Sequence, residues 1–384
     1  MKPKSGKKQV VRGQPSWRLA ADRVEAYVTE LGGQVGPVTF QLKGKKVRPF
    51  SVAPWVEEKT DPLLPPILKV LRGDFFCLPF GGNATPYRGE RHPVHGETAN
   101  ARWRFESLEA NKEAGCLHLS LNTQTRPGRV DKRIFVRQGH TAVYCQHTLS
   151  GMKGPMNLGH HAMLRFPDRP GCGAISTSRL VFGQVFPFPF ERPENRGYSL
   201  LKMGATFDSL ERVPTVTGET ADLTRYPARR GFEDLVLVVS DDQLPFAWTA
   251  VTFPADRHVW FALKNPRILR ETIFWISNGG RHYPPWNGRH VNVLGLEEVT
   301  SFFHLGLAES ARKNSLVQRG YPTCLKLNPH KPLVIPYLMG MAAVPAGFDR
   351  VAQIEAAADQ RSITLVSTSG KRVATPLALE FLEP

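Results

Sequence analysis

Short segments in which apolar and polar residues alternate constrain this chain more than any other feature of its sequence. The clearest one has Leu117, Leu119 and Leu121 on one face and His118 and Ser120 on the other. A period of two residues is typical of a strand that is buried on one face only. Further segments rich in Val, Ile, Phe, Trp and Thr are also expected to be strands: 133–137, 141–148, 235–240, 246–253, 258–263, 272–277 and 363–367.

Turn-forming clusters separate these segments, for example at 125–128 and 369–371, and the chain holds 33 glycines and 32 prolines. The best helix candidate is 307–318, which lies between two glycines, whereas 352–358 fits a helix or a strand. A chain with many strands and little helix favours an all-β fold. We therefore predict a large β-sandwich of two antiparallel sheets that pack face to face.

The N-terminus differs from the rest of the chain in charge. Lys2, Lys4, Lys7, Lys8 and Arg12 give the first twelve residues five positive charges and no negative ones. Residues 1–15 are therefore expected to be a disordered tail, and 16–384, which shows no repeat or linker, a single domain. The rest of the net charge of +16 is spread along the chain, without a basic helix or a zinc-finger spacing, so no nucleic-acid partner is expected.

The five cysteines are odd in number and widely spaced, and none forms a Cys-x-x-Cys pair. This usage argues against a disulfide framework and favours a reducing compartment. The basic N-terminus lacks the apolar region of a secretory signal, and no apolar stretch reaches the roughly eighteen residues of a membrane span. We expect a soluble, cytoplasmic protein without a membrane partner, and the sequence leaves its oligomeric state open.

Four segments are dense in the residue types that bind sugars. The first, 70–82, carries Arg72 beside a glycine, where it could face a ligand or pair with a carboxylate in the core. The second, 93–103, places His95 before a glycine that lets the backbone approach a ligand closely. It adds Asn100 and Trp103, an amide and a flat ring that suit hydroxyl groups and sugar faces. A polar loop with one buried tryptophan would have the same pattern.

The third segment, 158–167, contains the neighbours His160 and His161. Adjacent side chains on an extended backbone point to opposite faces, so at most one of these rings enters a given cleft. An imidazole titrates near neutrality and suits a general acid. A metal site made of the histidines at 92, 95, 160 and 161 is conceivable, but their spacing matches no known ligand pattern, and no metal or cofactor is expected.

The fourth segment, 275–306, includes Arg281 and Trp286, and its apolar run 293–296 leads into Glu297 and Glu298. On a strand, one glutamate of this pair faces inward and the other outward. Burial would raise the pKa of the inward carboxylate into the range that is useful for a base near neutrality. We expect Glu297 to face inward and Glu298 to lie in an exposed acidic turn.

These segments, in this order, resemble the aldose 1-epimerase (galactose mutarotase-like) superfamily, especially its hexose-6-phosphate mutarotase branch. That branch has an Arg-Gly-Gly strand, then Cys-x-Pro-x-Phe-Gly, then His-Gly-Phe-Ala-Arg and a tryptophan. This chain has Arg-Gly at 72–73, Cys-Leu-Pro-Phe-Gly at 77–81, His-Gly at 95–96 and Trp103. The stretch 159–166 resembles the family's catalytic histidine segment, with His161 the better match, and Leu296-Glu297-Glu298 resembles its catalytic glutamate segment. The resemblance covers the chain from about residue 24 onward.

The resemblance implies an enzyme, an isomerase that interconverts the α and β anomers of an aldose without a cofactor. Glu297 would take the proton from the anomeric hydroxyl and His161 would protonate the ring oxygen, from opposite sides of the sugar. Arg72, His95, Trp103 and Arg281 would converge with this pair on one sugar-binding cleft, and Asn100 and Trp286 would add further contacts. Ala99 stands where the branch has an arginine that holds the sugar phosphate, so we expect a small-molecule aldose without a phosphate.

Two other classes of function stay open. A non-catalytic carbohydrate-binding or sensor protein would keep the cleft but would tolerate the loss of Glu297 or His161. A glycoside hydrolase or lyase on a similar sandwich would need a second carboxylate facing Glu297. Asp74 and Glu97 are the only candidates for it in these segments.

Overall fold

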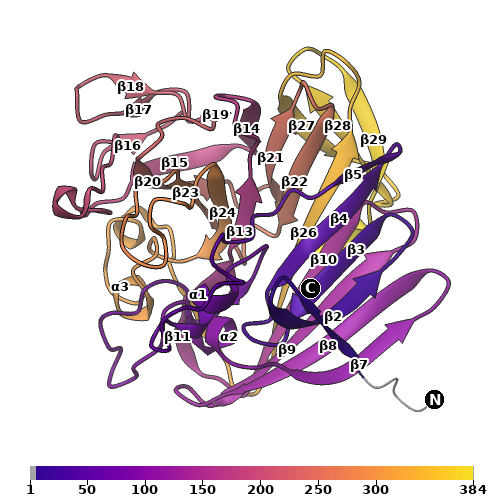
Figure 1. Cartoon of the computed structure of the whole chain (residues 1–384), viewed down its shortest axis with the longest axis horizontal. Helices are drawn as coiled ribbons and strands as arrows, with labels where there is room; N and C mark the ends of the chain where they lie inside the picture. The colour runs from indigo at the N-terminus through magenta and orange to yellow at the C-terminus, as the bar shows by residue number, and fades with distance from the viewer. Residues whose placement is uncertain (1–5, 384) are drawn as a thin grey trace.

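Two large antiparallel sheets pack face to face in the computed structural model, which describes residues 6–383 (Figure 1). The nine-stranded sheet runs in the order β19-β14-β21-β22-β26-β10-β9-β8-β7. Its strands are β7 (Arg104–Ala110), β8 (Ala114–Thr123), β9 (Gly128–Arg137), β10 (Ala142–Ser150), β14 (Gly173–Thr177), β19 (Arg225–Tyr226), β21 (Ala247–Phe253), β22 (His258–Lys264) and β26 (Leu333–Ala343). β26 is its last strand in sequence but lies near its middle, hydrogen-bonded to β10 on one side and to β22 on the other.

The eight-stranded sheet runs in the order β16-β15-β20-β23-β24-β12-β6, and β13 also pairs with β24. Its strands are β6 (Phe76–Cys77), β12 (Leu158–His160), β13 (Ala162–Arg165), β15 (Leu180–Val185), β16 (Thr206–Phe207), β20 (Glu233–Ser240), β23 (Glu271–Ser277) and β24 (Val293–Thr300). Val143 and Met339 of the nine-stranded sheet join Val236, Phe274 and Leu296 of this one in the main hydrophobic core. The predicted all-β sandwich is confirmed, and each strand predicted from the sequence lies on an observed one.

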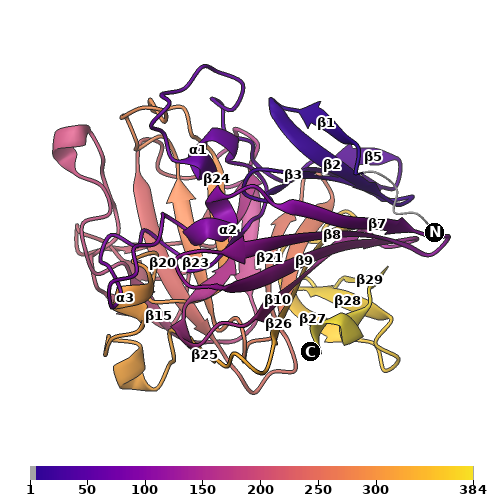
Figure 2. The ribbon, with the colours of Figure 1, turned by 90° about the horizontal axis from the view of Figure 1, so that it is seen from below.

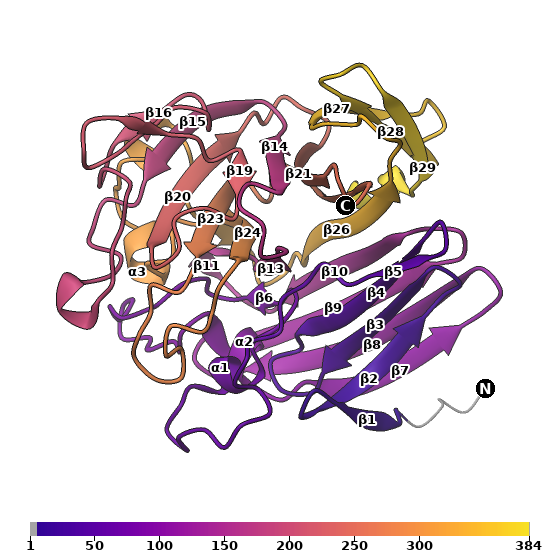
Figure 3. The same cartoon turned by 45° about the horizontal axis from the view of Figure 1, so that its top comes forward.

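A third, five-stranded sheet lies beside strands β7–β10 of the nine-stranded sheet (Figure 3). It contains β1 (Lys8–Val11), β2 (Gln14–Ala20), β3 (Val24–Thr29), β4 (Val35–Leu42) and β5 (Lys45–Val47). The sequence predicted a disordered tail over 1–15, but from residue 8 this stretch forms β1 and the start of β2, and Lys8 pairs with Glu30 at 2.7 Å. Residues 1–5 of the predicted tail lie outside the described residues.

A three-stranded sheet covers the opposite face of the nine-stranded sheet (Figure 2). It contains β27 (Val351–Ala356), β28 (Ser362–Ser367) and β29 (Arg372–Pro376), so the ambiguous stretch 352–358 is mostly strand. Phe348, Ile354 and Leu365 of this region pack on Phe261 and Leu338 in a hydrophobic cluster of their own. The strands β21, β22 and β26 of the nine-stranded sheet are therefore buried on both faces.

The helices are short. They are α1 (Pro66–Val70), α2 (Gly96–Asn100), α3 (Leu307–Ser310) and the 3-10 turns Pro193–Asn195, Val317–Arg319 and Leu379–Leu382. Separately, two minor two-stranded sheets pair β11 (Gly154–Met156) with β25 (Leu325–Leu327) and β17 (Val213–Pro214) with β18 (Thr220–Ala221). The predicted helix over 307–318 is wrong beyond Ser310. There the Asn314 side chain accepts the backbone N–H groups of Leu316 and Val317, which starts a separate turn. None of the helices in residues 6–383 has the length and apolar character that a membrane span requires.

Candidate active site

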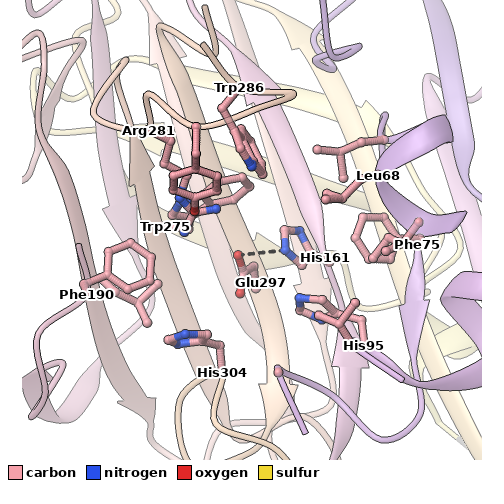
Figure 4. A pocket seen from close by; sticks show the side chains of 16 residues that line it. Leu68, Phe75, His95, His161, Phe190, Trp275, Arg281, Trp286, Glu297 and His304 are labelled. Carbon is pink, nitrogen blue, oxygen red and sulfur yellow. Dashed lines mark ion pairs between the residues drawn. The ribbon is translucent and has the colours of Figure 1, made fainter. Parts of the chain in front are cut away.

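A cavity of about 250 Å³ opens on the face of the eight-stranded sheet that points away from the main core (Figure 4). Its size is close to the lower end of the roughly 300–1,000 Å³ that ligand sites usually have. The polar residues that line it are His95, His161, Arg281, Tyr283, Glu297 and His304. The others are Ile67, Leu68, Leu71, Phe75, Gly82, Val94, Phe190, Leu235, Trp275 and Trp286.

Alternation along β24 brings Glu297 into this pocket. Leu294 and Leu296 point into the main core, whereas Val293 and Val299 belong to the hydrophobic cluster on the pocket face. Glu297 shares its parity with the two valines, and it lines the pocket with its side chain only 2% exposed. The structure therefore places Glu297 on the inward side of the strand, as the sequence suggested.

Glu298 points the other way, and the expectation of an exposed acidic turn is wrong. Its carboxylate is buried, lies 2.5 Å from the ammonium of Lys264, and accepts hydrogen bonds from the hydroxyls of Thr249 and Thr272. A buried charge is tolerated when it has both an opposite charge and hydrogen-bond partners. All three partners lie on strands far from residue 298 in the sequence, so the local pattern did not reveal them.

His161 stands between β12 and β13, where its backbone N–H lies 2.9 Å from the carbonyl oxygen of Phe75 and 3.1 Å from Oδ1 of Asp74. Its ring stacks on that of Phe75 with centroids 4.6 Å apart. Its Nε2 lies 3.2 Å from Oε1 of Glu297, as the dashed line in Figure 4 marks. The two residues expected to act together are therefore in direct contact at the pocket wall.

His160 turns in the opposite direction, as expected for neighbours on an extended backbone. Its Nδ1 lies 2.8 Å from Oδ2 of Asp74, and its ring packs on Tyr337 in the main core, with centroids 4.2 Å apart. One carboxylate, that of Asp74, thus contacts the ring of His160 and the backbone of His161.

Burial sets the protonation of the His161–Glu297 pair. Loss of solvent lowers the pKa of His161 to about 4 and raises the pKa of Glu297 well above its usual range. Both shifts disfavour charge, so burial favours a protonated carboxyl group on Glu297 beside a neutral imidazole on His161. Oε2 of Glu297 and Nδ1 of His161 have no hydrogen-bond partner among the described residues. Each residue therefore keeps one polar atom uncommitted.

Two further imidazoles line the pocket. His95 adopts a left-handed backbone conformation (φ 57°) just before α2, and its Nδ1 accepts the N–H of Gly81 at 3.3 Å. Its ring meets that of His161 edge to face at 5.0 Å. Burial lowers the pKa of His95 well below its usual range and that of His304 to about 3. At neutral pH these rings are uncharged and can donate or accept hydrogen bonds.

Arg281 lies at the pocket wall between aromatic rings and carboxylates. Its guanidinium carbon is 5.2, 5.1 and 4.8 Å from the ring centroids of Phe190, Trp275 and Trp286, respectively. Its Nε lies 2.6 Å from Oε1 of Glu191 and 3.8 Å from Oε2 of Glu233. Burial raises the pKa of Glu233 to about 7, against the opposing effect of Arg281. The positive charge of Arg281 is thus already matched within the protein.

Arg72, expected in the cleft, does not line the pocket. It is fully buried and donates its hydrogen bonds to the carbonyl oxygens of Val70, Val11 and Arg12, at 2.8–2.9 Å. Two of these carbonyls belong to the last residue of β1 and to the turn that follows it. Arg72 therefore ties the N-terminal strands to the rest of the protein. It neither faces the pocket nor pairs with a carboxylate, the two roles that its sequence context allowed.

Asn100 and Trp103 do not line the pocket either. Asn100 accepts the N–H of Ile67 and donates to the carbonyl of Val94, so it ties α1 to the segment before α2. Trp103 is buried, donates from Nε1 to the carbonyl of Thr98 at 2.9 Å, and stacks under the ammonium of a buried lysine. Of the sequence-predicted site residues, the pocket brings together His95, His161, Arg281, Trp286 and Glu297.

Several other residues that line the pocket were not predicted from the sequence. Trp275 and His304 lie within the fourth segment, and a signal for Trp275 was its place on a strand ahead of the glutamate pair. Leu68 and Phe190 come from α1 and from a proline-rich loop, and no periodicity marks these segments. Within residues 6–383, no group of three or more His, Cys, Asp and Glu side chains is arranged to hold a metal ion.

No protein-family model and no curated protein matches this chain. Solved structures match its fold. A candidate aldose 1-epimerase from Escherichia coli K12 is 11% identical with a TM-score of 0.57, over 86% of this chain and 99% of that one. A candidate aldose 1-epimerase from Klebsiella pneumoniae is 11% identical with a TM-score of 0.59, over 86% of this chain and 80% of that one. An aldose epimerase homologue from C. elegans is 12% identical with a TM-score of 0.56, over 86% of this chain and 100% of that one. At these identities, the likeness is one of fold.

Proposed function

We propose that this chain, which has the fold of the aldose 1-epimerase and galactose mutarotase-like proteins, is itself an aldose 1-epimerase. The observation that carries this proposal is the contact between His161 and Glu297, with Nε2 and Oε1 3.2 Å apart in a pocket on the sheet face. A proton donor and a proton acceptor that lie side by side are what the opening of a hemiacetal ring requires.

Ring opening moves two protons at neighbouring oxygens. The anomeric hydroxyl loses its proton, the bond between the anomeric carbon and the ring oxygen breaks, and the ring oxygen gains a proton. Both oxygens are bonded to the same carbon, so adjacent groups on one wall can reach both. This arrangement differs from the sequence-based expectation, in which His161 and Glu297 stood on opposite sides of the sugar.

The protonation of the empty site suggests which group does what. With Glu297 protonated and His161 neutral, His161 accepts the proton of the anomeric hydroxyl while Glu297 donates to the ring oxygen. These roles are the reverse of those that the family resemblance implied. Rotation about the bond next to the new carbonyl, followed by the reverse transfers, gives the other anomer and restores the pair.

Substitution of the pair tests the proposal. Glu297→Gln and His161→Asn keep shape and polarity but cannot pass a proton, so each should slow anomer exchange at least about a hundredfold. The double variant should lose little more, because both groups act in one step. NMR exchange spectroscopy or polarimetry across a panel of aldoses, with buffer catalysis subtracted, measures the rates.

Matched controls are available at exposed positions. Glu113→Gln and His330→Asn repeat the two substitutions on side chains far from the pocket, and they should leave exchange unchanged. His160 is a poor control because it is buried against Asp74. If no aldose exchanges faster than background while sugars still bind, the carbohydrate-binding alternative replaces the enzyme.

The hydrolase or lyase alternative finds less support. Asp74 lies behind the pocket wall, and Glu97 accepts backbone N–H groups from Gln124 and Thr125 on another side of α2. Glu297 is the only carboxylate among the described residues that line the pocket. A glycosidase of the usual kind needs a second carboxyl group across the substrate.

A further inference from the structure

One side of the pocket is formed only by hydrocarbon. Ile67, Leu68, Leu71 and Val94, from α1 and the segments next to it, make up this side, which we call the α1 wall. In Figure 4, Leu68 lies next to Phe75 and across the pocket from Phe190. None of the side chains of the α1 wall can donate or accept a hydrogen bond.

The polar groups of the pocket are few and partly occupied. His161 and Glu297 are assigned to the anomeric centre, Nε of Arg281 is held by Glu191, and Nδ1 of His95 accepts a backbone N–H. His304, Tyr283 and the terminal nitrogens of Arg281 can bind further hydroxyl groups, but none of them belongs to the α1 wall, and Figure 4 shows His304 and Arg281 across the pocket from Leu68. No Asp, Asn, Gln, Ser or Thr is among the described residues that line the pocket. A free hexose has several hydroxyl groups besides the anomeric one, and a buried hydroxyl without a partner is strongly penalised.

A phosphorylated sugar fits these surroundings no better. Arg281 is the only lysine or arginine among the described residues that line the pocket, and its charge faces Glu191 and Glu233. Arg72, the other arginine expected to contact the ligand, is fully buried and bound to backbone carbonyls. The pocket thus offers no uncompensated cation to a phosphate group.

We infer that the aldose bound here carries apolar substituents, as deoxy or O-alkyl positions, on the edge that faces the α1 wall. The inference rests on the proposed function, because it takes the His161–Glu297 pair to hold the anomeric end. Apolar substituents would displace water from the α1 wall and would leave no hydroxyl unpaired against it.

Three sugars that all keep a free anomeric hydroxyl test the inference: glucose, a deoxyglucose, and tetra-O-methylglucose. Binding is read from tryptophan fluorescence, since Trp275 and Trp286 line the pocket, and catalysis is read separately from NMR anomer exchange. We expect tetra-O-methylglucose to bind the wild-type protein at least about tenfold more tightly than glucose, with the deoxyglucose between them.

A substitution in the α1 wall sharpens the test. Leu68→Gln places an amide on the wall at a half-buried position, and it should reduce the preference for the methylated sugar by about tenfold. Leu63→Gln is the matched control, because Leu63 lies in the loop just before α1 but is 90% exposed and does not line the pocket. It should keep the wild-type preference.

The two readouts separate the inference from the proposed function. Equal or tighter binding of glucose, no fluorescence response to any of the three sugars, or an unchanged preference in Leu68→Gln would each overturn the inference. Accelerated exchange of glucose without a preference for apolar sugars would support the proposed epimerase activity and would contradict the inferred apolar substrate. Preferential binding of the apolar sugars without anomer exchange would support the inferred ligand class and would contradict the proposed epimerase activity.

Discussion

Neighbouring side chains at 160 and 161 occupy two different environments, and both depend on one carboxylate. Asp74 contacts the ring of His160 in the core and the backbone N–H of His161 at the pocket. The sequence predicted that the two rings would diverge, since the extended backbone dictates it. Its choice of His161 for the pocket came from resemblance to a family, and the contact of His161 with Glu297 required the fold to be known.

The pKa of His161 predicts how catalysis depends on pH. Because burial lowers this pKa to about 4, His161 stays unprotonated through neutrality and can accept a proton. As the pH falls towards 4, His161 becomes protonated and loses this ability. We expect kcat/KM for anomer exchange to be flat around neutral pH and to fall only on approach to about pH 4. A fall centred near the ordinary histidine pKa, about 6.5, would contradict the burial argument.

Asp74 serves as a positioning residue in this account. Its negative charge raises the pKa of His161 in opposition to burial. Asp74→Asn should therefore shift the acid limb of the pH profile to lower pH, in addition to slowing exchange. A purely structural role would slow exchange without moving the limb. Asp208→Asn, at an exposed position away from the pocket, is the control and should change neither quantity.

At the scale of strands and helices, the sequence predicted position better than orientation. Alternation located β8 well because only one of its faces is fully buried. β20, β21, β23 and β24 are buried along their whole length on both faces, so alternation could not tell their two faces apart. The fate of Glu298 shows the consequence, because its buried partners belong to other strands.

A glycine on β24 leaves space for the carboxylate of Glu297. A Cβ atom at Gly295 would lie 2.7 Å from Oε1 of Glu297 and 3.0 Å from Cβ of Trp275. Gly295→Ala should push the flexible end of Glu297 away from His161 and slow exchange at least about tenfold, because a misplaced group loses alignment. The close approach to Cβ of Trp275 should also lower the melting temperature, which circular dichroism measures separately from anomer exchange. A variant that exchanges anomers at the wild-type rate would show that the carboxylate needs no such room.

For the whole molecule, the sequence indicated a sandwich of two sheets. The structure adds two further sheets, a five-stranded one on one face of the nine-stranded sheet and a three-stranded one on the other. Two of the residues in the motifs that resembled a known family connect parts of the structure and do not line the pocket. Arg72 holds the turn between β1 and β2, and Asn100 links α1 with the start of α2. The order of the motifs therefore located the segments that form the pocket. The local sequence could not show which of their side chains bind other parts of the protein instead of lining the pocket.

β26 is the strand on which the nine-stranded sheet depends, since it alone joins the half containing β10 to the half containing β22. Met339 lies opposite Val143 on one side and Ala262 on the other. Met339→Pro would break pairing at this seam and should destabilise the protein by at least about 3 kcal/mol. Val10→Pro, on the exposed edge strand β1, should cost far less. Urea unfolding followed by circular dichroism compares them, and equal losses would contradict the central role of β26.

The late position of this strand in the chain has a consequence for biosynthesis. On the ribosome, β10 and then β22 emerge long before β26, and at five to twenty residues per second roughly ten to forty seconds separate β10 from its partner. During that time each has an unpaired edge that can template association with other nascent chains. Pairing across so large a sequence separation is also slow in its own right. We therefore expect the yield of folded protein to depend on chaperones that shield these edges, and to fall when translation is made faster or the temperature higher.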